Sequence, residues 1–165
     1  MIFAKRNNVY YNIYYRGDTV DDNLKRSVIL EHYQHPVHRG LINDDSYLTS
    51  NTNSDSCIDE IDLMVKVEDG KISDIRFDGE ACAICTSSTS IMIDTLIGKS
   101  IDEVKEIYNN YVKMIEEQEF DADVLEQAIV YEDISKQPNR KKCALLPWWG
   151  LEKIMQKIEE GDINE

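Results

Sequence analysis

The stretch IDLMVKVEDGKISDIRF, residues 61–77, decides the fold. Apolar residues alternate with polar ones on both sides of its Asp69-Gly70 pair, and a period of two is typical of a β-strand with one buried face. The alternating apolar residues are Ile61, Leu63, Val65, Val67, Ile75 and Phe77. Asp-Gly is a preferred two-residue hairpin turn because its residues tolerate positive φ. The stretch therefore predicts an antiparallel hairpin that packs one face against a core.

The residues before the hairpin predict one helix and one short strand. A helical pattern begins near Asp21 and ends near Pro36. Residues 41–56 are rich in Asn, Asp, Ser and Thr, whose side chains compete for backbone hydrogen bonds and favour turns. Within this loop, Tyr47 and Leu48 indicate a short strand that can join the hairpin.

The residues after the hairpin predict helices. The first is capped by Thr86, Ser87 or Ser88 and runs to Gly98, and the second opens with a capping box from Ser100 to Glu103. A third covers residues 124–129 and is terminated by Pro138-Asn139. The last begins around Cys143 and has Pro147 in its first turn. Strands precede most of the helices, so the fold class is α+β. The prediction is a small antiparallel β-sheet with helices packed on one face.

Length and charge limit the organisation and the partners. The 165 residues suit one domain, which we place at residues 21–165, preceded by a poorly ordered N-terminal extension over residues 1–20. Lys and Arg total 18 against 32 Asp and Glu, and the net charge of −14 disfavours nucleic acid and anionic membrane as partners. No apolar run is long enough to span a bilayer or to form a secretory signal. We therefore expect a cytoplasmic protein.

Four cysteines and one aspartate form the candidate site. Cys57 and Asp59 are two residues apart, Cys82 and Cys85 form a C-x-x-C pair, and Cys143 lies far along the chain. In a reducing cytosol these thiols stay free for metal binding, catalysis or burial. Each cysteine falls at a predicted element boundary, and helix starts favour thiolates. Three thiolates and a carboxylate would complete a four-coordinate zinc site, with a net charge of about −2.

Several nearby residues have both a functional and a structural interpretation. Basic residues at 140–142 precede Cys143 and can balance a negative site, although a solvated charge run is the commoner reason for such a cluster. Cys85 can be a fourth thiolate, a second sulfur carrier or a buried residue, and we favour burial. The histidines at 32, 35 and 38 fit a solvated helix face rather than a metal cluster. The tryptophans at 148 and 149 fit a docking patch and a core equally well.

Four motifs resemble one family in order and spacing. They are Val28-Ile29-Leu30-Glu31-His32-Tyr33, Cys57-Ile58-Asp59, Gly79-Glu80-Ala81-Cys82 and Lys142-Cys143-Ala144-Leu145-Leu146. From about residue 24 to residue 155, the chain is similar to the IscU/NifU-N iron–sulfur cluster assembly scaffold family. It resembles the SufU branch most, because Lys142 stands where IscU-branch scaffolds have a ligand histidine, and because the helical segment after Gly98 is extended.

The resemblance implies a site and an activity. SufU-like proteins bind zinc through three cysteines and an aspartate, which here implies Cys57, Asp59, Cys82 and Cys143 as metal ligands. The resemblance also implies that Cys57 is the catalytic persulfide acceptor. The partners would be a SufS-like cysteine desulfurase and downstream cluster assembly proteins. The family motif is C-G-D, whereas this chain has Ile58 in place of the glycine.

Three functions remain open on the sequence alone. The first is a zinc-dependent sulfurtransferase that passes on persulfide sulfur. The second is an IscU-like scaffold that binds iron and a [2Fe–2S] cluster at the same residues. The third is a structural zinc module that acts only through protein contacts. The scaffold should purify brown, and the transferase should purify colourless.

Overall fold

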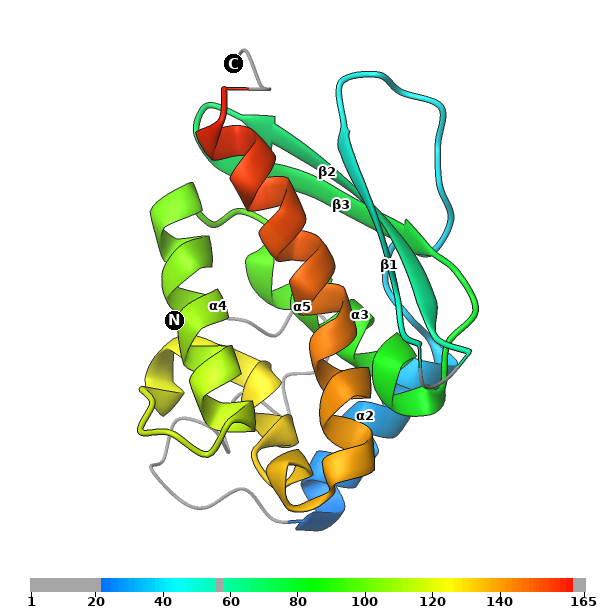
Figure 1. Cartoon of the computed structure of the whole chain (residues 1–165), viewed down its shortest axis with the longest axis vertical. Coiled ribbons are helices and arrows are strands. Elements are labelled where there is room, and N and C mark those ends of the chain that lie inside the picture. The colour runs from blue at the N-terminus through cyan, green and yellow to red at the C-terminus, as the bar shows by residue number, and fades with distance from the viewer. Residues whose placement is uncertain (1–21, 56–57, 162–165) are drawn as a thin grey trace.

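The structure is a computed structural model, and it describes residues 22–55 and 58–161. The elements are α2 (Asp22–Gln34), β1 (Leu48–Asn53), β2 (Glu60–Glu68), β3 (Lys71–Asp78), α3 (Ala83–Leu96), α4 (Ile101–Ile115), the 3₁₀ segments η1 (Ala122–Tyr131) and η2 (Ile134–Lys136), and α5 (Pro138–Glu159). Figure 1 shows the sheet beside the long α5, with the other helices grouped around it. The predicted extension over residues 1–20 lies outside the described residues.

The predicted hairpin is confirmed and supplies two of the three strands of the sheet, β2 and β3. The strand order is β1-β2-β3, and both pairings are antiparallel. Leu63 lies opposite Phe77 across the hairpin, and Leu48 lies opposite Val65 in the other pair. The turn residues Asp69 and Gly70 have φ of 54° and 73°, as an Asp-Gly turn requires.

One face of the sheet carries the core, as the alternating pattern predicts. Leu63, Val65 and Phe77 are each at most 1% exposed. Both β1 and β2 contact α5, and β3 contacts α3. Burying each of these side chains contributes about 1.5–3 kcal/mol to stability. The fold is therefore α+β with helices on one face.

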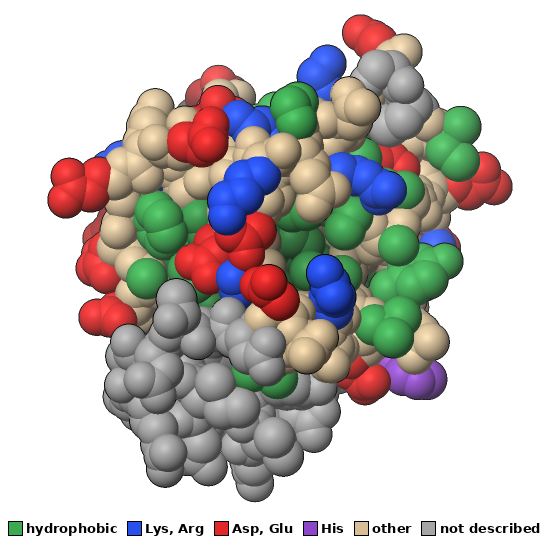
Figure 2. Space-filling model, turned by 90° about the horizontal axis from the view of Figure 1, so that it is seen from below, with side chains coloured by type: hydrophobic (Ala, Val, Ile, Leu, Met, Phe, Trp, Pro, Cys, Tyr) green, Lys and Arg blue, Asp and Glu red, His purple; other side chains and the backbone are tan. Residues whose placement is uncertain are grey.

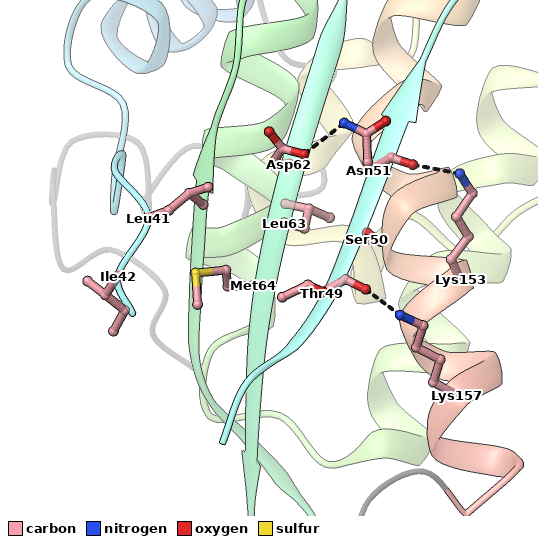
Figure 3. Close-up of a pocket in the computed structure, with 10 residues that line it drawn as sticks. All are labelled: Leu41, Ile42, Thr49, Ser50, Asn51, Asp62, Leu63, Met64, Lys153 and Lys157. Atoms are coloured by element: carbon pink, nitrogen blue, oxygen red, sulfur yellow. Dashed lines mark hydrogen bonds between the residues drawn. The ribbon is translucent and has the colours of Figure 1, made fainter. Parts of the chain in front are cut away.

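The free edge of β1 is blocked by two lysines of α5. Lys153 Nζ donates to the carbonyl oxygen of Asn51 at 2.7 Å, and Lys157 Nζ donates to that of Thr49 at 2.6 Å (Figure 3). Four residues along a helix and two along a strand both span about 6–7 Å, so the two spacings match. A helix whose lysines cover an edge strand in this way hinders pairing of that strand with another chain.

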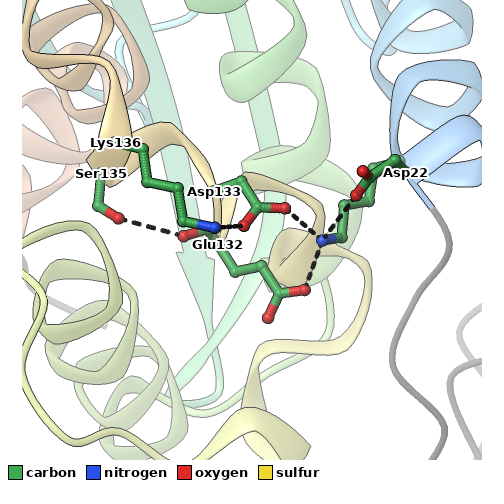
Figure 4. A network of polar contacts seen from close by, with 6 residues as sticks. Asp22, Glu132, Asp133, Ser135 and Lys136 are labelled. Atoms are coloured by element: carbon green, nitrogen blue, oxygen red, sulfur yellow. Dashed lines mark hydrogen bonds and ion pairs between the residues drawn. The ribbon is translucent and has the colours of Figure 1, made fainter.

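A polar network fastens α2 to the segment between η1 and η2. Lys25 Nζ lies 2.7 Å from Glu132 and also contacts Asp133 and Asp22 (Figure 4). Burial lowers the pKa of Lys25, but hydrogen bonds with Asp133 and Glu132 outweigh that effect and raise it to about 12.

The surface shown in Figure 2 carries charges of both signs, interspersed with one another. The acidic composition therefore produces no continuous negative patch among the described residues of that face.

The predicted N-cap of α3 is wrong by four to six residues. The helix begins at Ala83, and Cys82 is its N-cap, with a sulfur that accepts from the Cys85 amide. The Thr and Ser residues at 86–88 instead lie inside the helix and are buried. Hydroxyl side chains can stay inside a helix when they find partners there or on neighbouring elements. The capping box from Ser100 to Glu103 is confirmed at the start of α4.

The last two predicted helices also differ from the structure. Residues 122–131 form a 3₁₀ segment with a kink at Glu126, where φ is +52°. Pro138 does not end that segment but starts α5, because proline is tolerated at the first position of a helix. Cys143 therefore lies in the second turn of α5 rather than at its start, and Pro147 lies in the helix interior.

We predict that Gly79→Ala destabilises the chain more than Gly98→Ala. Both glycines have positive φ, at 137° and 88°, so alanine is strained at either position by about 1–3 kcal/mol. A Cβ at Gly79 would also lie 2.0 Å from the Glu60 carbonyl oxygen, whereas one at Gly98 meets nothing within 4 Å. Urea denaturation measures both losses. Equal losses would show that this close approach is relieved without cost.

Candidate metal centre

Asp59, Cys82 and Cys143 converge from three different elements. One carboxylate oxygen and the two sulfur atoms all lie within 4.8 Å of one another. Asp59 directly precedes β2, Cys82 caps α3, and Cys143 lies on α5. The fold thus brings together three of the four residues predicted as ligands.

Backbone hydrogen bonds hold the Asp59 carboxylate in place. The Cys82 amide donates to Asp59 Oδ1 at 2.7 Å, and Asp59 Oδ2 lies 3.4 Å from Cys82 Sγ. The Ser54 amide donates to the Asp59 carbonyl at 3.1 Å, which closes the loop on its other side. Asp59 is only 1% exposed, so its charge requires such partners. One carboxylate oxygen is therefore fixed, and the other faces the sulfur atoms.

The two cysteines differ in their surroundings. Cys82 is half-buried and is the N-cap residue of α3. Burial raises the pKa of the Cys143 thiol, and the neighbouring Cys82 and Asp59 raise it further. In the absence of a cation, Cys143 is therefore protonated at neutral pH. A bound cation would reverse this effect, because it stabilises the thiolate directly.

The donor set fits a tetrahedral metal ion. Zinc bonds to oxygen and sulfur are about 2.0–2.3 Å long, so ligand atoms around it lie about 3.3–3.8 Å apart. The 3.4 Å between Cys82 Sγ and Asp59 Oδ2 falls within this range. Iron accepts thiolates as well, so the three donors suit either metal.

The fourth predicted ligand, Cys57, lies outside the described residues. Its neighbour Ile58 is described and is 79% exposed. Cys85 is confirmed as a buried residue with no exposed surface, and it is not part of the cluster of donor atoms. Its amide contributes by donating to Cys82 Sγ at 3.4 Å.

The basic run and the histidines differ in placement. Lys142 is exposed beside Cys143, and the Lys141 ammonium lies 3.8 Å from the Glu117 carboxylate.

The prediction that the histidines lie on a solvated helix face is wrong for His32. Its side chain is 3% exposed and is hydrogen-bonded to Ser90 at 2.7 Å and to Gln127 at 3.0 Å. Because these partners come from distant parts of the chain, the local pattern could not show them.

The tryptophans and the hydroxyls of α3 complete the core. Trp148 is fully buried and stacks on Tyr111, with ring centroids 4.1 Å apart, whereas Trp149 is only partly buried. All five residues at 86–90 are Thr or Ser, and each is at most 2% exposed. Sequence reasoning missed this buried polar run. Its signal was present as five consecutive hydroxyl residues between apolar ones.

Comparisons with known proteins agree on one family. Residues 24–144 match the model of the NifU-like N terminal domain. The chain is 34% identical to the zinc-dependent sulfurtransferase SufU of Bacillus subtilis, over 86% of this chain and 95% of that one. It is also 34% identical to the iron–sulfur cluster assembly scaffold protein IscU of Thermotoga maritima, over 79% and 91%. The crystal structure of a SUF-system cluster assembly scaffold protein from Fervidobacterium islandicum matches with a TM-score of 0.72 at 35% identity, over 76% and 91%.

Within the described residues, no helix is long and apolar enough to cross a membrane.

We predict that Cys85→Ala costs stability but not metal, and that Cys82→Ala costs metal. Removing the fully buried Cys85 sulfur leaves a small cavity, which should lower the free energy of unfolding by about 1 kcal/mol. Cys82 supplies a donor atom, so its loss should release the ion. Urea denaturation and elemental analysis measure the two effects. Metal loss from Cys85→Ala would place Cys85 in the site.

Proposed function

The chain belongs to the family of NifU-like N-terminal domains, and from this premise we propose that it is an iron–sulfur cluster assembly factor that acts as a zinc-dependent sulfurtransferase. The observation that carries the proposal is the convergence of Asp59, Cys82 and Cys143 on one point. A carboxylate oxygen and two cysteine sulfurs within 4.8 Å of one another are donor types that zinc accepts. The similarity to a zinc-dependent sulfurtransferase over 86% of the chain supports the choice of activity.

The proposed metal ligands are Cys57, Asp59, Cys82 and Cys143. Two residues of chain extend at most about 7 Å, so the Cys57 backbone is tethered within that reach of the Asp59 backbone. Zinc would supply positive charge that keeps the thiolates deprotonated at neutral pH. Burial raises the pKa of the Cys143 thiol, so a cation would be needed to favour its thiolate at neutral pH.

Cys57 is the proposed sulfur acceptor. Its thiolate would attack the terminal sulfur of a persulfide on the desulfurase, and the bond between the two persulfide sulfurs would break. The desulfurase cysteine leaves as a thiolate, and Cys57 gains the persulfide, so no external oxidant or reductant is needed. The partner would be a SufS-like cysteine desulfurase, and the product would pass to downstream cluster assembly proteins in the cytoplasm.

A scaffold function is the second candidate, and the 34% identity to an IscU protein favours it. Both functions would use the same donor atoms. The two differ at Lys142, because an ammonium group has three donors and no lone pair with which to bind a metal. Lys142 is exposed next to Cys143, where it can balance negative charge.

The proposal predicts that Cys57→Ala abolishes sulfur acceptance. The test measures metal content and desulfurase activation on one anaerobic preparation, followed by mass spectrometry after incubation with desulfurase and cysteine. We expect about one zinc per chain, desulfurase activation and a persulfide on Cys57. Cys85→Ala is the matched control and should still accept sulfur. A folded, active chain without metal would refute the zinc site, and a persulfide on Cys85 would reassign the acceptor.

We also predict that Lys142→His shifts the chain toward holding a cluster. Imidazole supplies the nitrogen ligand that lysine lacks, so a reconstituted cluster should persist longer in the variant than in the wild type. Reconstitution with iron and sulfide, followed by visible absorption over time, measures persistence. Lys141→His is the control for adding an imidazole one residue away. A wild-type cluster as persistent as that of Lys142→His would favour the scaffold over the transferase.

A further inference from the structure

The helix that carries Cys143 contains a proline one turn after this residue. Pro147 lies inside α5 and has no amide hydrogen, so the carbonyl of Cys143 receives no helical hydrogen bond from that position. The proline ring also crowds the same carbonyl. Contacts from other elements must therefore hold the turn around Cys143.

Two buried hydroxyl groups meet at the next carbonyl. Ser88 Oγ donates to the Ala144 carbonyl oxygen at 2.7 Å, and the Tyr111 hydroxyl donates to it at 2.9 Å. The indole Nε1 of Trp148 donates to Ser88 Oγ at 3.3 Å. Ser88, Tyr111 and Trp148 are all fully buried, and the stacking of Tyr111 on Trp148 fixes the direction of the phenol.

These hydrogen bonds join the two helices that carry the candidate sulfur ligands. Ser88 lies on α3, six residues after its N-cap Cys82, and six residues of helix are a rigid rod of about 9 Å. Ala144 directly follows Cys143 on α5. The bond from Ser88 to Ala144 therefore sets where Cys143 lies relative to Cys82. Tyr111 adds the third helix, α4, to the same junction.

We propose that Ser88 and Tyr111 are positioning residues of the metal site, which hold the Cys143 sulfur at ligand distance from Cys82 by fixing the Ala144 carbonyl. This inference rests on the proposed zinc site. Neither side chain touches the metal, and both act through the backbone next to a ligand. Removing such an outer contact typically weakens metal binding about 10- to 100-fold.

Tyr111→Phe tests the inference with a close control in Tyr108→Phe. Tyr111→Phe keeps the ring that stacks on Trp148 and removes only the hydroxyl. Tyr108 is also on α4, and its hydroxyl also bonds to α5, at Glu152 Oε2 over 2.7 Å, nine residues beyond Cys143. Each variant therefore loses one hydrogen bond between α4 and α5, and only that of Tyr111 lies beside a ligand. Tyr111→Phe also loses a 3.3 Å contact with Ser88 Oγ on α3, which belongs to the same junction.

The measurements are zinc affinity by competition with a chromophoric chelator, and the absorption spectrum of the cobalt-substituted chain. Circular dichroism and the thermal midpoint of the metal-free chains report the fold. We expect Tyr111→Phe to bind zinc at least about tenfold more weakly and to shift the cobalt bands, because the thiolate set is displaced. Tyr108→Phe should match the wild type in both. Ser88→Ala removes the other donor and should weaken zinc binding in the same way, which provides a second variant if Tyr111→Phe does not fold.

The outcomes separate this inference from the proposed function. Wild-type zinc affinity and an unchanged cobalt spectrum in both Tyr111→Phe and Ser88→Ala would overturn the positioning role and leave the zinc site intact. Equal losses in Tyr111→Phe and Tyr108→Phe would also overturn it, because general helix packing would then be the cause. A folded wild-type chain that binds neither zinc nor cobalt would overturn the zinc site itself, and this inference with it.

Discussion

The hydrogen bond from the Cys82 amide to Asp59 Oδ1, 2.7 Å long, connects the start of α3 to the start of β2. It gives the buried carboxyl group of Asp59 a hydrogen-bond donor, while its second oxygen faces the sulfur atoms. Gly79 allows the chain to turn there, since its backbone lies against the Glu60 carbonyl, and the Glu60 amide in turn donates to the Glu80 carbonyl.

The site brings acidic donor groups together in a chain whose net charge is already −14. Asp59 and Cys143 are nearly fully buried, and their proximity raises the pKa of the Cys143 thiol. The thiol therefore stays protonated at neutral pH, and a bound cation would be needed to favour its thiolate. The remainder of the molecule is held by contacts that do not depend on the site, such as the Lys25 network and the capping box of α4. The fold therefore does not depend on the charge of the site.

The features that could be predicted from the sequence are those set by neighbouring residues. A period of two with Asp69-Gly70 fixed the hairpin, and the spacing from Ser100 to Glu103 fixed the start of α4. The errors depend on distant residues. The buried hydroxyls of α3 resembled caps because their partners, such as Ala144, lie more than fifty residues away. For the same reason the burial of His32 beside Ser90 and the kink at Glu126, which pairs with Lys99, could not be read locally. In the site, donor types were readable, but their approach to within 4.8 Å was not.

The arrangement of Pro147 suggests why the junction with α3 and α4 is needed. In a helix without proline, the amide of residue 147 would donate to the Cys143 carbonyl, and Pro147 removes that one hydrogen bond. The turn is then held by side chains, and side chains can hold a ligand at an orientation that an ideal helix would not give it. Trp148 directly follows the proline, and its ring supports both the hydroxyl of Ser88 and the phenol of Tyr111. Pro147, which removes a backbone hydrogen bond of α5, and Trp148, which supports the side chains that contact the Ala144 carbonyl, are thus neighbours. The candidate ligand Cys143 lies one turn before them.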